Sequence, residues 1–153
     1  MKTLDYTWYQ EAAYSTCTPE CYTDDYLNPG YISEIGEFAG KIAKTVRGDN
    51  VQGEDIMMEL GDCAWMIAVR AKLYNIKLIF TKNILPQFTY KSDHEQNLLW
   101  AFLNNWDISY QWLLLKHTCE SLGFSFDEVL KMNNKKLESR QKRNVIQGNG
   151  DYR

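Results

Sequence analysis

Apolar residues recur every three or four positions through most of the chain, which is the period of an amphipathic helix. Leu4, Trp8 and Ala12 fall on one stripe and predict a first helix over residues 4–16. The same period predicts further helices over residues 31–46, 54–75, 94–105, 107–122 and 125–140. A chain of 153 residues is long enough for one domain with a substantial core. We therefore expect an all-α fold, a helical bundle of about five or six helices, in a single domain over residues 1–153.

Three interruptions divide this pattern. Asn28-Pro29-Gly30 is a strong helix breaker, so the second helix is expected to begin just after it. Residues 47–53 are polar and flanked by glycines, and such a short connection makes the helices on either side antiparallel. Residues 76–93 break the period and predict an extended loop or a small pair of strands. The region at about 76–108 is a possible insertion in the bundle.

The second and third predicted helices each have an apolar stripe for the core. On the second helix the stripe consists of Ile32, Ile35, Ala39, Ile42 and Val46. On the third helix it consists of Ile56, Leu60, Ile67 and Ala71. A separate face of the second helix carries acids first and lysines later: Glu34, Glu37, Lys41 and Lys44. This order also suits the helix dipole, so it has a purely structural explanation as well.

Two near-copies of one tetrapeptide lie on these two helices. The first is Glu34-Ile35-Gly36-Glu37 and the second is Glu59-Leu60-Gly61-Asp62. Residues three apart share a helix face, so each copy directs two carboxylates the same way. A glycine inside a helix costs roughly 1 kcal/mol relative to alanine. Its presence in both copies suggests that another group approaches the backbone closely at each.

The hairpin between the copies is expected to bring the four acids together. Four carboxylates without cations would repel one another and raise one another's pKa, and a hard divalent cation relieves this. Mg²⁺ prefers oxygen ligands and keeps positions for water and substrate phosphates. The spacing thus indicates a magnesium site that receives a polyphosphate. The alternative is a pair of amphipathic helices whose acidic faces are solvated.

The order Glu34-x-x-Glu37, a gap of 21 residues, then Glu59-x-x-Asp62 resembles the metal-binding signature of the MazG-like, all-α nucleoside triphosphate pyrophosphohydrolases. Trp65 follows the second pair by three residues, as in that family. The segment Asn133-x-x-Lys136-Leu137-x-x-Arg140 and the tail Gly148-x-Gly150-Asp151-Tyr152-Arg153 are also similar to MazG-like proteins, including those of phages. Ser33 departs from the pattern, because the family often has glycine before the first acid.

The resemblance implies hydrolysis of a nucleoside triphosphate to the monophosphate and pyrophosphate, in nucleotide-pool housekeeping. It implies Mg²⁺ as cofactor, with Mn²⁺ as a possible substitute, and a homodimer or homotetramer. Four acids would hold the metal, and Glu37 or Glu34 would also take a proton from water: Glu34, Glu37, Glu59 and Asp62. Four cations would balance the polyphosphate charge: Lys44, Arg47, Lys136 and Arg140. Asn133 would hydrogen-bond the substrate, and Trp65 either stacks on a base or belongs to the core.

Other functions stay open at this point. The same fold could act on dUTP or dCTP, on a phosphoribosyl-nucleotide or on a guanosine-polyphosphate alarmone. A non-catalytic helical module that binds nucleotides or a partner protein is the alternative from another class. The sequence also indicates a cellular location. No apolar run is long enough for a transmembrane helix, and the N-terminus has no signal-peptide core. We therefore expect a cytoplasmic protein with no membrane contact.

Charge and cysteine content add two further expectations. The net charge is −3, but the chain from Lys131 onward has seven basic and two acidic residues. We interpret this basic end as a phosphate clamp; a solvated tail or a weak nucleic-acid contact are alternatives, and stable nucleic-acid binding is not expected. Cys63 and Cys119 lie in helical patterns and are expected to be buried, while Cys17 and Cys21 lack the spacing of a zinc finger.

Overall fold

A computed structural model describes residues 3–81 and 93–145 of the chain. Within these ranges the chain forms six α-helices, one short 3₁₀ helix and two strands of two residues each. In chain order the elements are β1 Leu4–Asp5, α1 Thr7–Ser15, η1 Pro19–Cys21, α2 Asp24–Arg47, α3 Gly53–Leu73, β2 Ile79–Phe80, α4 His94–Leu103, α5 Ile108–Ser121 and α6 Phe126–Lys142. The predicted all-α fold, a bundle of about six helices, is therefore confirmed.

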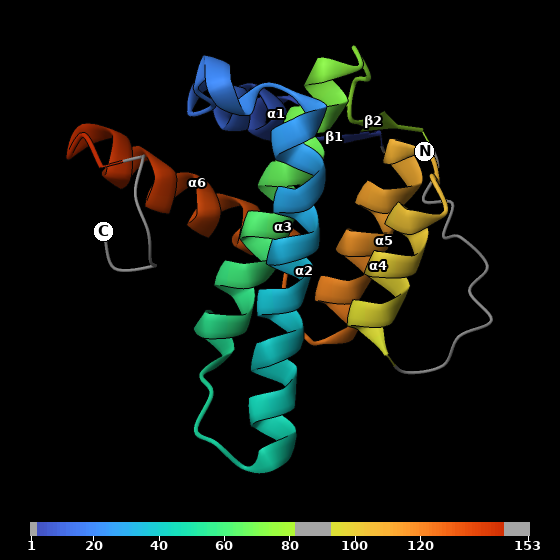
Figure 1. Cartoon of the computed structure of the whole chain (residues 1–153), viewed down its shortest axis with the longest axis vertical. Coiled ribbons are helices and arrows are strands. Elements are labelled where there is room, and N and C mark those ends of the chain that lie inside the picture. Colours follow the sequence, from blue (N-terminus) through green and yellow to red (C-terminus); the bar gives the residue numbers. More distant parts are fainter. Residues whose placement is uncertain (1–2, 82–92, 146–153) are drawn as a thin grey trace.

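Helices α2 and α3 form a long antiparallel hairpin at the centre of the molecule (Figure 1). Nearly every residue of α3 from Glu59 to Ala71 is buried, because this helix packs against α1, α2, α5 and α6. Helices α4 and α5 lie side by side on one flank, and α6 extends on the other. Gly48 ends α2 with a φ of 94°, a left-handed conformation that strains residues with a side chain. The antiparallel hairpin predicted from residues 47–53 is thus confirmed.

Helix α2 begins seven residues earlier than predicted, at Asp24 instead of residue 31. It runs through Asn28-Pro29-Gly30, so the prediction of a break there is wrong. The side-chain oxygen of Thr23 accepts a hydrogen bond from the backbone N–H of Tyr26 and caps the helix. Pro29 lies only in the second turn, where its missing N–H removes a single helical hydrogen bond. Burial of Leu27 before it and Tyr31 after it holds the continuous helix in place.

The predicted core stripe of α2 is only partly correct. Its buried residues are Leu27, Tyr31, Ile35 and Phe38. Ile32 and Val46, which belong to the predicted stripe, are 42% and 83% exposed. The core side of the helix is rotated because the larger side chains, Tyr31 and Phe38, take the buried positions. On α3 the prediction holds better, since Leu60, Ile67 and Ala71 are all fully buried.

The N-terminal prediction needs a correction as well. Residues 4 and 5 form a strand, not helix, and Leu4 pairs antiparallel with Phe80 of β2. Helix α1 then begins at Thr7, and it buries Tyr9 and Ala13 while Trp8 is 43% exposed. The sequence predicts an extended loop or a small pair of strands over residues 76–93. The described part of this range contains one strand, β2, and its partner is β1 at the N-terminal end of the chain.

The rest of the core follows the predicted pattern. Trp112 of α5 is fully buried and makes edge-on ring contacts with Phe126 and Tyr6. Cys63 and Cys119 are buried, as predicted. Helix α6 begins after Ser125, whose side-chain oxygen accepts a hydrogen bond from the backbone N–H of Glu128 and caps the helix. Within the described ranges every helix is too short or too polar to traverse a lipid bilayer. The predicted tail motif at 148–153 and residues 82–92 of the possible insertion lie outside the described residues.

Candidate metal centre

Three of the four predicted acids meet between α2 and α3. One carboxylate oxygen from each of Glu34, Glu59 and Asp62 lies within 4.8 Å of the others. Glu34 comes from α2, and the other two lie on one face of α3, three residues apart. Glu37, one turn further along α2, is exposed and is not part of this group. The hairpin therefore produces a cluster of three carboxylates, and the fourth predicted acid, Glu37, follows Glu34 by three residues on α2.

The cluster is partly withdrawn from water, and this changes its protonation. Glu59 is 2% exposed. Burial, followed by the negative charges of Asp62, Glu37 and Glu59, raises the pKa of Glu34 to about 8. At neutral pH the Glu34 carboxyl therefore holds a proton in the metal-free protein. A group titrating this close to neutrality is typical of a functional site.

Two lysines neutralise the other two carboxylates. The Nζ of Lys136 on α6 donates to both oxygens of Asp62, each at 2.6 Å. The Nζ of Lys41 on α2 lies 3.4 Å from Oε1 of Glu59. The cluster thus consists of two ion pairs and the protonated Glu34 carboxyl. Its donor atoms are all carboxylate oxygens from two facing helices, so these residues fit a hard divalent cation such as Mg²⁺.

Helix α6 approaches α3 closely at the second tetrapeptide. A Cβ atom placed on Gly61 would lie 2.8 Å from Cβ of Asn133, closer than real contacts allow. This approach lets Nδ2 of Asn133 donate to Oδ1 of Asp62 at 2.8 Å. Among the described residues, and apart from the helix's own backbone, nothing lies within 4 Å of a Cβ placed on Gly36. The expected close approach is therefore confirmed at Gly61, while at Gly36 no described part of the chain makes one.

The structure places the two cations predicted on α2, Lys44 and Arg47, away from the cluster. Arg47 pairs with Asp49 at the exposed hairpin turn. It lies thirteen residues from Glu34, which at a rise of about 1.5 Å per residue is roughly 20 Å along the helix. Lys44 is exposed, about 10 Å beyond Glu37 on the same axis. Neither is brought to the carboxylates.

The two remaining predicted residues are buried. Trp65 belongs to the core, since its Nε1 donates to the backbone oxygen of Ala13 at 3.1 Å and to Oγ1 of Thr16 at 2.9 Å. A tryptophan fixed in this way does not stack on a substrate base. Arg140 is buried on α6, one turn beyond Lys136.

The predicted site residues omit two that the structure places at the centre. Lys41 lies seven residues after Glu34 and four after Glu37, so its place on the acidic face was visible as helical spacing. Tyr9 of α1 donates its hydroxyl to Oδ1 of Asn133 at 2.8 Å. These two residues are 124 positions apart, and no local pattern in the sequence could have joined them.

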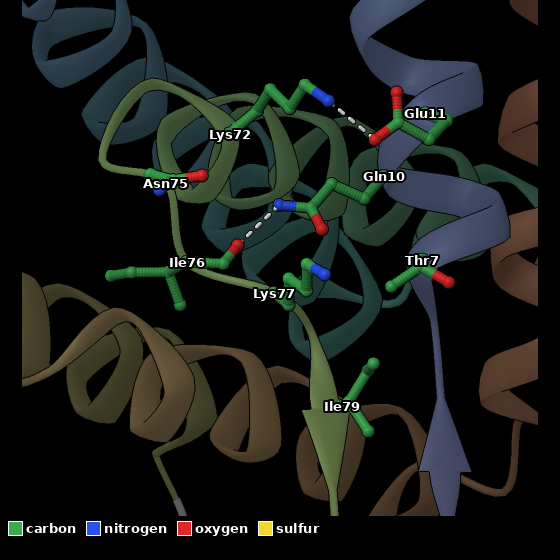
Figure 2. A pocket seen from close by; sticks show the side chains of 8 residues that line it. All are labelled: Thr7, Gln10, Glu11, Lys72, Asn75, Ile76, Lys77 and Ile79. Atoms are coloured by element: carbon green, nitrogen blue, oxygen red, sulfur yellow. Dashed lines mark hydrogen bonds and ion pairs between the residues drawn. The ribbon is translucent and has the colours of Figure 1, made fainter.

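A separate pocket of about 310 Å³ lies where α1 meets the end of α3 and the segment leading to β2 (Figure 2). Its polar groups bond to one another: Lys72 pairs with Glu11 at 2.6 Å, and Nε2 of Gln10 donates to the backbone oxygen of Ile76 at 2.7 Å. None of the clustered carboxylates lines it. The candidate site is therefore the carboxylate cluster and not this pocket.

The chemistry of the cluster follows from its donor set. Carboxylate oxygens at this spacing can share a divalent cation, and lysines that pair with them in its absence can turn to phosphate oxygens when it binds. No protein-family model, curated protein or solved structure matches the chain.

Proposed function

We propose that this protein is a Mg²⁺-dependent pyrophosphohydrolase of the MazG-like type, which hydrolyses a nucleoside triphosphate to the monophosphate and pyrophosphate. The observation that carries the proposal is the meeting of Glu34, Glu59 and Asp62 oxygens within 4.8 Å. Burial of Glu59 beside two other acids does not favour the stability of a hairpin, because desolvation of a buried carboxylate costs roughly several kcal/mol. The order of these acids in the sequence, and the resemblance it carries, point to the same reaction.

Glu34, Glu59 and Asp62 would hold the ion, which when bound neutralises phosphate oxygens and lowers the pKa of a bound water. Glu37 is exposed beside this group and is suited to accept a proton at its carboxylate. Lys41 and Lys136 would bind the phosphate oxygens once their own carboxylates are engaged elsewhere. The resemblance adds Arg140, one turn beyond Lys136 on α6, as a further cation for the polyphosphate, while Asn133 would act through its hydrogen bond to Asp62.

An assay for pyrophosphate separates this function from its alternatives. The full chain is incubated with Mg²⁺ and each common nucleoside and deoxynucleoside triphosphate, dUTP included, and separately with a phosphoribosyl-nucleotide and a guanosine polyphosphate. EDTA provides the metal-free control. We expect pyrophosphate in equimolar amount with the monophosphate, none in EDTA, and at least a roughly 100-fold loss in Glu59→Gln with the helical circular dichroism retained.

Other outcomes of this assay would either narrow the substrate or contradict the proposal. Release of inorganic phosphate would mean cleavage at another bond. Preference for dUTP or dCTP would select a narrower substrate within the same reaction. Turnover of a phosphoribosyl-nucleotide or a guanosine polyphosphate alone would change the substrate class. No turnover of any nucleotide would favour a non-catalytic binding module.

We also propose that the protein self-associates through the outer face of α2. Small and apolar residues recur there at alternating spacings of four and three, the spacing of a coiled-coil seam. They are Ile32, Gly36, Ala39, Ala43 and Val46. At about 100° per residue this seam lies on a different side of α2 from both the core residues and the acids. Exposed apolar side chains and an open glycine permit another helix to pack closely.

The seam predicts a mass change in solution. Ala43→Arg places a charge in the seam and is expected to convert a dimer or tetramer to a monomer in sedimentation analysis. Thr45→Arg is the matched control, because it adds the same charge at an exposed position nearly opposite on the helix. A wild-type monomer at high concentration, or an Ala43→Arg variant of unchanged mass, would contradict the proposal.

A further inference from the structure

A series of hydrogen bonds leads from the buried Tyr9 side chain of α1 to Asp62. Tyr9 is fully buried, and its hydroxyl donates to Oδ1 of Asn133 at 2.8 Å. Asn133, also buried, donates from Nδ2 to Oδ1 of Asp62 at 2.8 Å. Three helices, α1, α6 and α3, thus contribute one link each. The series connects a residue with no charge and no exposure to one of the clustered carboxylates.

The oxygen and the nitrogen of an amide side chain differ in hydrogen bonding, and in Asn133 each atom meets a suitable partner. Oδ1 can only accept and Nδ2 can only donate. Because Tyr9 donates to Oδ1, the Nδ2 end is directed at the carboxylate of Asp62, which can only accept when ionised. The reversed amide would place two acceptor oxygens against each other. The reversal would also take from the Tyr9 hydroxyl its acceptor at 2.8 Å and leave it the backbone oxygen of Gly61 at 3.4 Å, so Tyr9 favours the orientation of Asn133 in which Asp62 receives a donor.

Lys136 alone does not fix the position of Asp62. The side chains of Lys136 and Asp62 are 14% and 18% exposed, so this ion pair lies at the edge of water and its lysine can move away. Asn133 cannot, since it is held between Tyr9 and the backbone of Gly61, with its Nδ2 3.1 Å from the position of a Cβ there. A carboxylate that exchanges its lysine for a cation keeps its place only through the buried amide.

We propose that Tyr9 is a positioning residue for the candidate metal centre, holding the Asp62 carboxylate in its ligating orientation through Asn133. This inference rests on the proposed function, because it requires a cation at Asp62. Groups that orient a metal ligand from behind typically change metal affinity by about 10–100-fold when they are removed. The inference makes cation binding depend also on α1, a helix that contributes none of the clustered carboxylates.

The test is a titration of the full-length protein with Mn²⁺, followed by the electron paramagnetic resonance signal of the free ion. Tyr9→Phe removes one oxygen and keeps the ring that packs against Trp112, so the fold is retained; the melting temperature verifies this. We expect about tenfold weaker Mn²⁺ binding. Tyr31→Phe is the matched control: its hydroxyl is equally buried and has no hydrogen-bond partner among the described residues. Its affinity should equal that of the wild type.

A double-mutant cycle separates positioning from packing. If Tyr9 acts through Asn133, Tyr9→Phe adds no further loss of affinity in an Asn133→Ala background. A merely structural effect of the hydroxyl would persist in that background and would overturn the inference. Equal Mn²⁺ affinity in Tyr9→Phe and wild type would overturn it too, while leaving the proposed function intact. Absence of Mn²⁺ binding by the wild type would overturn both.

Discussion

Glu34→Gln is expected to stabilise the metal-free protein strongly at pH 8 and only weakly at pH 5. An unfolded glutamate releases its proton near pH 4.5, whereas burial raises the pKa of Glu34 in the folded protein to about 8. Between these values the folded state binds one more proton than the unfolded state, so the free energy of unfolding falls as the pH rises. Glutamine is never ionised and does not incur this loss.

The size of the effect follows from the two pKa values. Each pKa unit corresponds to about 1.4 kcal/mol, so complete loss by pH 8 amounts to on the order of 4 kcal/mol. At pH 5 most of that stability is still present, and the variant should gain less than about 1 kcal/mol. The side chain is partly exposed, which reduces the pH 8 value toward roughly 2–3 kcal/mol.

Urea unfolding of wild type and variant in EDTA, at pH 5 and pH 8, measures this difference. Glu138→Gln, on the exposed surface of α6, controls for the loss of one negative charge. Addition of Mg²⁺ at pH 8 should stabilise the wild type and should have little effect on Glu34→Gln, because the variant lacks a ligand. If the free energies of unfolding of wild type and Glu34→Gln differed by the same amount at pH 5 and pH 8, the pKa of Glu34 would not be raised in the folded protein.

The hairpin and its acids could be predicted from the sequence because both depend on local spacing. Helical period, a polar connection at 47–53 and two acids three residues apart are sufficient to place Glu34, Glu59 and Asp62 near one another. Exposed Glu37 shows the limit of this reasoning. Two acids three residues apart on a helix differ by about 60° around its axis, so Glu34 can face α3 while Glu37 is directed toward solvent.

What the sequence could not predict depends on competition between distant parts of the chain. Pro29 is a breaker by local propensity, yet burial of Leu27 and Tyr31 against the bundle prevails over it. The core side of α2 was misplaced because two apolar stripes lie on this helix, and only tertiary packing decides which of them is buried. The Tyr9–Asn133 bond joins the first helix to the last, and it has no local signature.

The two tetrapeptide glycines predict opposite responses to the same substitution. Gly36→Ala should stabilise the protein by about 0.5–1 kcal/mol, because alanine restricts the unfolded chain and favours helix, and no described residue outside the helix's own backbone lies within 4 Å of the new methyl group. Gly61→Ala gains the same propensity but places the methyl group 2.8 Å from Cβ of Asn133. Overpacking of this kind costs about 1–3 kcal/mol, so the net effect should be destabilising.

Asn133 cannot relieve this contact at little cost, and this is why the clash is expected to prevail over helix propensity. Its amide is held by Tyr9 on one side and by Asp62 on the other, so any shift of α6 breaks buried hydrogen bonds worth about 1 kcal/mol or more each. Urea unfolding of both variants in the Ala43→Arg background removes any contribution from self-association through Gly36. Gly61→Ala should also weaken Mn²⁺ binding, whereas Gly36→Ala should not. Stabilisation by both substitutions would mean that α6 does not approach α3 at Gly61, and the hydrogen-bond chain to Asp62 would lose its geometric basis.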